Sequence, residues 1–274
     1  MLAAFGTVAQ WDDHEVTNDF YGTDMTPAFQ AQMTAGNEAF RDYMPIRDDG
    51  GDPLQLYRSF QWGQAAEFFV IDDRQYRSAP AYVTEPACLD MGEPIVLPAG
   101  TCAAEINDPS RTYLGAPQKQ WLKDGLLNST ATFKFVMNGP LISNLIYLPY
   151  DRWDGYAAER TEMIDDIKIN DIRNVVFLST DIHALIVNSQ VGDAMPPIIQ
   201  EWVSGAIGMD PIYRELPASI APLVPQLPAL FSTIAYFDID RFNYGVIDVS
   251  TTGATVTYRD TTGAVLKQFT VPAS

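Results

Sequence analysis

The two histidines of this 274-residue chain, His14 and His183, each lie among acidic residues. His14 belongs to an acidic segment at residues 11–19, and His183 ends the short sequence Asp181-Ile182-His183. Carboxylate oxygens and imidazole nitrogens bind Ca, Mn, Fe and Zn ions in proteins, and carboxylate-rich sites favour the harder cations among these. Both segments are therefore candidates for a metal centre.

Each segment also has a less specific interpretation. A histidine at a strand end is often simply hydrogen-bonded within the fold, and an acidic segment is often a solvated loop. Trp11 favours a metal site over a solvated loop. A buried tryptophan would fix the loop and hold three neighbouring carboxylates close together, and their mutual repulsion would be costly unless a cation neutralises them. On an extended chain Asp181 and His183 point to the same side. The two segments together favour a metal site that both of these residues face.

The secondary structure expected around these segments is that of an α/β protein. Hydrophobic patterning predicts strands at residues 67–72, 133–137, 174–178 and 198–203, and helices at 27–43, 118–127 and 156–169. Buried strands that alternate with helices carry ligands at their carboxyl ends, and Asp181 follows the strand at 174–178. We expect the rest of residues 1–60 to form long loops and residues 78–112, with many Pro and Gly, to be irregular.

The C-terminal part has a different pattern. Residues 235–274 contain three strand-like segments, at 244–250, 254–259 and 264–271, separated by Thr-Gly turns. This pattern predicts an antiparallel meander. The chain has no internal repeat and no convincing linker, so we expect residues 1–274 to form a single domain.

Composition excludes several classes of protein. The chain has 35 Asp and Glu against 17 Lys and Arg, a net charge of -18, which disfavours binding to duplex nucleic acid or to anionic membrane surfaces. No run approaches the roughly 20 apolar residues of a membrane-spanning helix. The motifs of a serine-hydrolase elbow, a dinucleotide-binding loop and a Walker loop do not occur. Cys88 and Cys102 enclose a short segment and are compatible either with a disulfide or with two free thiols.

Several segments resemble the PhoD-like alkaline phosphatase and phosphodiesterase family of the metallophosphoesterase superfamily. They include Trp-Asp-Asp-His-Glu-Val at 11–16, Ile-Asp-Asp-Arg-Gln-Tyr-Arg at 71–77, Trp-Asp-Gly-Tyr at 153–156 and Asp-Ile-His at 181–183, with further matches at 42–47, 56–60 and 111–115. The resemblance implies an α/β fold with a metallophosphoesterase-type β-sandwich flanked by helices (α/β/β/α). It also implies a periplasmic or extracellular enzyme that hydrolyses small phosphate esters with metal-activated water, using Ca, Fe, Mn or Zn ions.

The resemblance also assigns roles to individual residues. Asp13, Asp181 and His183 would bind metal, and His14 would assist departure of the leaving group. Contacts to the phosphate, or to the residues that hold the metal, would come from Asp12, Asn18, Arg74 and Arg160. Ion pairs of Arg74, Arg77 and Arg160 with the neighbouring Asp72, Asp73 or Glu159 are the alternative for these arginines.

Two features depart from the family pattern. Thr180 precedes Asp181 where the family has a glycine, and the family's early metal motifs belong upstream of Trp11, where the ten residues contain no Asp, Glu, His or Cys. We therefore expect the N-terminal part of the fold to be missing. A catalytically inactive relative that serves as a binding module is the alternative hypothesis, and a metal-binding protein without phosphatase activity ranks third.

Overall fold

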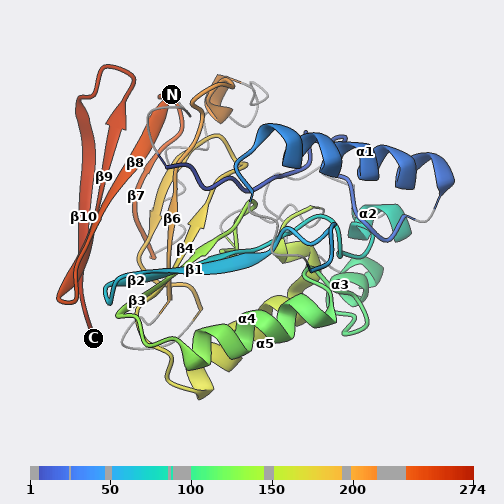
Figure 1. Cartoon of the computed structure of the whole chain (residues 1–274), viewed down its shortest axis with the longest axis horizontal. Helices are drawn as coiled ribbons and strands as arrows, with labels where there is room; N and C mark the ends of the chain where they lie inside the picture. Colours follow the sequence, from blue (N-terminus) through green and yellow to red (C-terminus); the bar gives the residue numbers. More distant parts are fainter. Residues whose placement is uncertain are drawn as a thin grey trace.

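The computed structural model describes residues 6–24, 26–46, 51–85, 88, 100–144, 151–192, 199–214 and 233–274. In these ranges the chain forms two β-sheets and a set of helices (Figure 1). The α/β fold and the sandwich of sheets flanked by helices that the sequence predicts are confirmed.

The larger sheet has seven strands in the order β1-β2-β3-β4-β6-β5-β7. Strands β2, β3, β4 and β6 run parallel to one another, whereas β1, β5 and β7 are antiparallel to their neighbours. The four parallel strands therefore end at the same edge of the sheet. The strands are β1 (Arg58–Trp62), β2 (Ala66–Val70), β3 (Phe133–Met137), β4 (Val175–Ser179), β5 (Leu185–Asn188), β6 (Ile199–Val203) and β7 (Ile234–Asp238).

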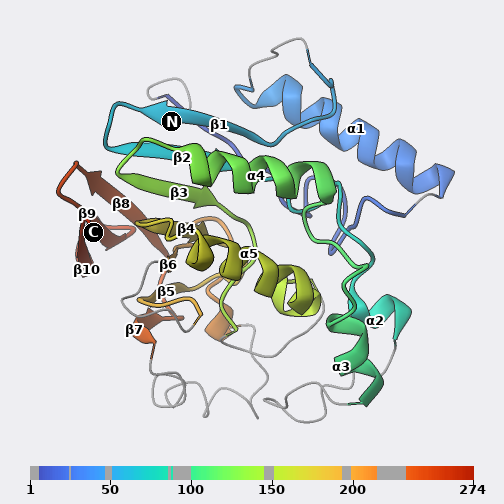
Figure 2. The same cartoon turned by 90° about the horizontal axis from the view of Figure 1, so that it is seen from below.

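Two long helices cover one face of this sheet, α4 (Ala116–Asn128) and α5 (Ala157–Ile169), the second preceded by the short 3-10 helix η2 (Trp153–Tyr156) (Figure 2). Pro117 lies in the first turn of α4, where its missing N–H has no helical partner to lose. Apolar side chains recur on the buried sides of both helices and pack against alternate residues of the strands. They are Leu122, Leu126, Met163, Ile164 and Ile167 from the helices, and Phe69, Val136, Val175, Phe177 and Ile199 from the sheet.

The smaller sheet packs on the opposite face. It consists of β8 (Asn243–Val249), β9 (Gly253–Asp260) and β10 (Val265–Pro272), in the order β10-β9-β8, and both pairings are antiparallel. Ala254, Val256 and Tyr258 of β9 pack against the larger sheet in one apolar cluster. The meander expected at 235–274 thus begins at β8, because β7 pairs with β5 of the larger sheet.

The N-terminal region is anchored by helix α1 (Pro27–Tyr43), which has the bounds that the sequence predicts. Met33 and Phe40 on its buried side pack with Trp11, Phe20 and Leu56 in a separate cluster. This cluster attaches the acidic segment at 11–19 to the rest of the fold.

Residues 78–112 are less irregular than expected. They contain the short helices α2 (Ala81–Thr84) and α3 (Gly100–Ile106). Cys88 and Cys102 form a disulfide, and both lie in a small buried cluster with Ala81 and Ile106. The disulfide decides between the two alternatives that the sequence left open.

Replacing both cysteines with alanine should lower the free energy of unfolding by about 3 kcal/mol, because the disulfide closes a loop of fourteen residues and restricts the unfolded chain. Urea denaturation of the double variant and the unsubstituted protein measures the difference. A change below about 0.5 kcal/mol would contradict this account of the disulfide.

Candidate active site

The acidic segment that begins at Trp11 is fixed by that residue. The indole ring is 1% exposed, its centroid lies 5.4 Å from that of Phe20, and its Nε1 donates a hydrogen bond of 2.9 Å to Asp72 Oδ1. Asp13 turns the chain, since its carbonyl oxygen accepts bonds from the N–H groups of two following residues and its Oδ2 accepts one from Asp19 N at 2.8 Å. Asp12 and Asp13 are therefore held against the end of β2.

The ends of β2, β3 and β4 supply the opposite side of the site. Asp72, Asp73 and Arg74 follow β2, Gly139 follows β3, and Asp181 follows β4. Gly139 N donates to Asp73 Oδ2 at 2.9 Å, and a Cβ atom at this glycine would lie 2.3 Å from the same oxygen and 3.4 Å from Asp12 Cγ. Glycine is thus required at 139, because any side chain would separate the strand end from the two carboxylates.

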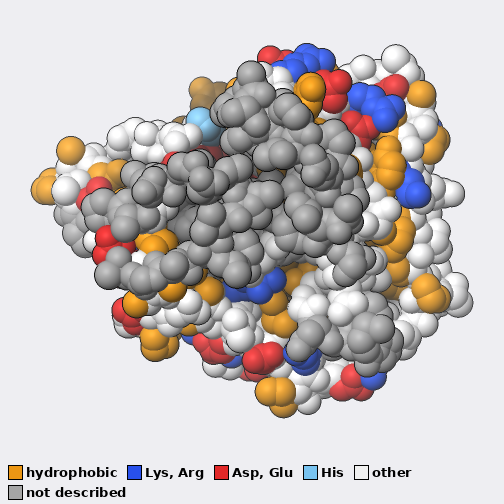
Figure 3. Space-filling view, turned by 180° about the vertical axis from the view of Figure 1, so that it is seen from behind, with side chains coloured by type: hydrophobic (Ala, Val, Ile, Leu, Met, Phe, Trp, Pro, Cys, Tyr) orange, Lys and Arg blue, Asp and Glu red, His pale blue; other side chains and the backbone are white. Residues whose placement is uncertain are grey.

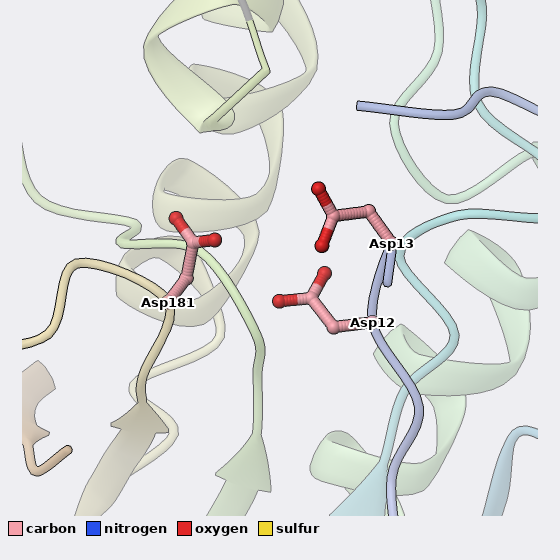
Figure 4. A group of neighbouring side chains, drawn as sticks. All are labelled: Asp12, Asp13 and Asp181. Atoms are coloured by element: carbon pink, nitrogen blue, oxygen red, sulfur yellow. The ribbon is translucent and has the colours of Figure 1, made fainter. Parts of the chain in front are cut away.

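Three carboxylates converge here, those of Asp12, Asp13 and Asp181 (Figure 4). Oxygens of all three lie within 4.8 Å of one another, and the side chains point toward a common centre from the N-terminal segment and from the end of β4. A second group, formed by Asp13, Asp19 and Asp151, meets the same distance limit and shares Asp13 with the first. Both groups offer oxygen ligands only, which is the donor set that hard cations such as Ca²⁺ and Mn²⁺ prefer.

Arg74 lies between these carboxylates and is fully buried. Its Nη2 is 2.5 Å from Asp12 Oδ1 and 4.0 Å from both Asp13 Oδ1 and Asp181 Oδ1, and its Nη1 donates to Asp151 Oδ2 at 3.0 Å. One guanidinium group therefore faces four carboxylates. The expected pairing of Arg74 with Asp72 or Asp73 is wrong, because the guanidinium group extends past them to residues distant in sequence.

Arg77 is the second buried cation of the site. Its Nη1 donates to the carbonyl oxygen of Asp151 at 2.7 Å, its Nε donates to that of Phe20, and its Nη2 is 3.9 Å from Asp151 Oδ2. The five carboxylates of the two groups thus outnumber the three buried guanidinium groups that act on them, those of Arg74, Arg77 and Arg152. This leaves an excess of negative charge that a bound cation would neutralise.

The pKa values of the carboxylates in the site reflect their burial and this excess of negative charge. Burial raises the pKa of Asp181 well above its usual range, and the carboxylates of Asp151 and Asp12 act in the same direction. Burial also raises the pKa of Asp12, despite the opposing charge of Arg74. Burial and the neighbouring Asp151 raise the pKa of Asp19 to about 6. For Asp151 burial acts upward as well, but Arg74 and Arg77 outweigh it and lower the pKa.

The two histidines differ in their relation to these groups. His14 is next to the first group, with its Nε2 3.9 Å from Asp13 Oδ1, and its side chain is 80% exposed. His183 belongs to neither group among the described residues. Asp181 and His183 have φ angles of 67° and 52°, so the chain is not extended here and the extended-strand reason for placing both side chains on one side does not apply. A metal-binding role for His183 stays a prediction.

Asn18 and Arg160, the other residues predicted for the site, have different surroundings. Asn18 is exposed in the acidic segment. Arg160 is half-buried on α5, and its Nε donates to the carbonyl oxygen of Ile142. Glu159, its expected partner, accepts bonds from Tyr113 N and Leu114 N. Thr180 is exposed, and its hydroxyl would lie 3.2 Å from a Cβ atom at Gly205.

Asp19 and Asp151 belong to the candidate site although the sequence patterns do not indicate them. Asp19 ends the same acidic segment as Asp13 and has a φ of 55°, a conformation that Asp tolerates better than most residues. Asp151 directly precedes the Arg-Trp-Asp-Gly-Tyr sequence that contains η2. The cluster of Asp, Arg and aromatic residues just before a helix could have indicated a site at Asp151. It does not reveal which strand ends the Asp151 carboxylate faces.

The family model for PhoD-like phosphatases matches residues 1–258. The chain belongs to the PhoD-like phosphatase family. Two relatives agree with the assignment. Alkaline phosphatase D of Bacillus subtilis (strain 168) is 36% identical over 198 residues, which cover 66% of this chain and 32% of that protein. A solved structure described as the structure of PhoD is 26% identical with a TM-score of 0.77, covering 97% of this chain and 52% of that one.

This PhoD-like chain thus spans about a third of the curated relative and about half of the solved one. None of the helices in the described ranges is long and apolar enough to cross a membrane. Figure 3 shows Lys and Arg side chains that lie next to Asp and Glu on the described part of one face. Arg214 forms an ion pair with Asp210, and Arg241 forms one with Asp238.

Proposed function

We propose that this PhoD-like phosphatase hydrolyses phosphate monoesters or diesters with metal ions held by Asp12, Asp13 and Asp181. One observation carries the proposal: three carboxylates from two separate segments converge at the carboxyl ends of parallel strands, with oxygens within 4.8 Å of one another. Such a cluster has a strong tendency to bind a cation, because its ionised groups repel one another in a partly buried place.

The ligand chemistry narrows the choice among Ca, Fe, Mn and Zn. Oxygen ligands alone favour Ca²⁺ or Mn²⁺ over Zn²⁺, which commonly takes nitrogen and sulfur ligands. Asp19 and Asp151, together with Asp13, would hold a second cation beside the first. When bound, the cations would lower the pKa of a coordinated water and screen the negative charge on the phosphoryl oxygens.

The side chains of this chain have separate tasks in the proposed reaction. His14, exposed beside Asp13, is in a position to give a proton to the departing alcohol. Arg74 is fully buried and directed at carboxylates, so it orients the ligands and does not reach the substrate. Trp11 and Asp72 fix the segment that carries His14 and Asp13.

Replacing His14 with alanine should lower kcat for a bis-aryl phosphate about 100-fold, as loss of a general acid does. The free energy of unfolding should not change, because the side chain is exposed. Steady-state kinetics and urea denaturation measure the two quantities. Thr17→Ala is the control in the same segment, since Thr17 is exposed and its hydrogen bonds with Asp13 and Phe20 use only backbone atoms of Thr17. Equal kcat values for the two variants would contradict the role of His14.

Metal analysis of the purified protein separates this function from the alternative of a binding module. Bound metal and turnover of the bis-aryl phosphate support the phosphatase. A well-folded protein that contains no metal, gains none on incubation with Ca²⁺ or Mn²⁺ and has no turnover would support the binding module.

We also propose a periplasmic or extracellular location. The Cys88–Cys102 disulfide supports it, because such bonds persist in oxidising compartments. Detection of the protein in the cytoplasmic fraction alone, with both cysteines reduced, would argue against it.

A further inference from the structure

A buried carboxylate outside the two metal-capable groups lies beneath the proposed site. Glu201, in the middle of β6, is fully buried. Its Oε1 accepts hydrogen bonds from Ile142 N at 2.9 Å and Ser179 Oγ at 2.6 Å, and its Oε2 accepts one from Ser143 N at 3.1 Å. Three donors thus converge on one charged acceptor, and bonds of this kind are about twice as strong as neutral ones.

These bonds connect the ends of β3 and β4 to the middle of β6. Ser179 is the last residue of β4, and its Oγ also accepts a bond of 3.0 Å from Asn138 Nδ2. Asn138 directly follows β3, and its Oδ1 accepts a bond from Trp153 Nε1 at 3.0 Å. Glu201 on β6, Ser179 on β4 and Asn138 after β3 therefore form a continuous buried network.

The network reaches the candidate site through the residues that follow β3 and β4. Thr180 N donates to the Gly139 carbonyl oxygen at 2.8 Å, which joins the β3 and β4 ends directly. Gly139 in turn binds Asp73 and closely approaches Asp12. Asp181 lies two residues after Ser179 and has a φ of 67°.

We infer that Glu201 and Ser179 are positioning residues, which hold the end of β4 so that the Asp181 carboxylate stays within ligand distance of Asp12 and Asp13. The inference rests on the proposed metal-dependent function. Neither residue belongs to the metal-capable groups of the described part of the chain. Groups that orient metal ligands from behind typically change metal affinity 10- to 100-fold when they are removed.

The test compares two buried serines that each take part in one network of this region. Ser179→Ala removes the hydroxyl that joins Glu201 to the end of β4. Ser143→Ala, the matched control, removes a hydroxyl that accepts a bond of 2.6 Å from Asn188 Nδ2, but it keeps the backbone N–H that binds Glu201. Calorimetric titration of the metal-stripped proteins with Mn²⁺ measures affinity, and urea denaturation measures stability.

We expect Ser179→Ala to weaken Mn²⁺ binding at least 10-fold and Ser143→Ala to change it less than 2-fold, these being rough limits for the loss of an orienting group. A merely structural role would lower the stability of both variants and leave Mn²⁺ affinity unchanged, and this result would overturn the inference alone. Absence of Mn²⁺ binding by the unsubstituted protein would overturn the proposed metal site and the inference with it.

Discussion

Replacing Arg74 with methionine should lower the free energy of unfolding of the metal-free protein by about 3–5 kcal/mol, the usual effect of removing one partner of a buried ion pair. The guanidinium group is fully buried and lies within 4.0 Å of four carboxylates. Without it the carboxylates of Asp12 and Asp151 lose their nearest cation. Urea denaturation in EDTA measures the loss.

Addition of Mn²⁺ should recover more stability in the Arg74 variant than in the unsubstituted protein, because the cation replaces the missing positive charge. Arg77→Met is the matched control. Arg77 is equally buried, but its two short hydrogen bonds go to the carbonyl oxygens of Asp151 and Phe20. We expect Arg77→Met to lower the free energy of unfolding, and we expect Mn²⁺ to stabilise this variant little more than it stabilises the unsubstituted protein. Equal recovery in both variants would contradict the role of Arg74 as the main positive charge among the carboxylates.

Replacing Asp181 with asparagine should reduce kcat/KM for a bis-aryl phosphate at least 1,000-fold, equivalent to about 4 kcal/mol of lost transition-state stabilisation. Asparagine has nearly the same shape as aspartate but no charge, so the cluster loses one anionic ligand. The affinity for Mn²⁺ should fall in parallel. Kinetics at saturating Mn²⁺ and calorimetric titration measure the two effects.

Asp171→Asn controls for the backbone conformation of Asp181. Both aspartates have positive φ angles, 51° at Asp171 and 67° at Asp181, and asparagine tolerates this region well. Asp171 is exposed in the turn after α5 and pairs with Arg173. Its replacement should leave kcat/KM unchanged. A variant at Asp181 that retains full activity would remove this residue from the site.

Much of the site could be predicted from sequence because it follows from the ends of parallel strands. The strand predicted at 174–178 is β4, and it ends two residues before Asp181. The apolar Trp11 within an acidic segment correctly indicated an anchored loop, and its indole packs in a buried cluster. Both signals are local, since they depend on neighbours in sequence and on side-chain polarity.

What the sequence could not predict depends on contacts between distant segments. Arg74 pairs with Asp12 and Asp151 across 62 and 77 residues, and no short-range pattern specifies such partners. The orientation of His183 depends on backbone angles that a strand pattern does not reveal. Among the strands, β1 has three exposed residues of five, and β5 has only four residues. Both provide too little hydrophobic alternation to be recognised.

The order in which the site is assembled follows from the chain positions of its carboxylates. Asp12 and Asp13 are synthesised well before Asp181, and in the folded chain they lie beside Asp181 at the end of β4, which pairs with β3. Contacts between such distant residues form late in folding, because closing a long loop costs entropy before any contact can compensate for it. A nascent chain therefore has the acidic segment but not the complete cluster. A cation held by all three carboxylates would therefore bind only after the sheet has formed.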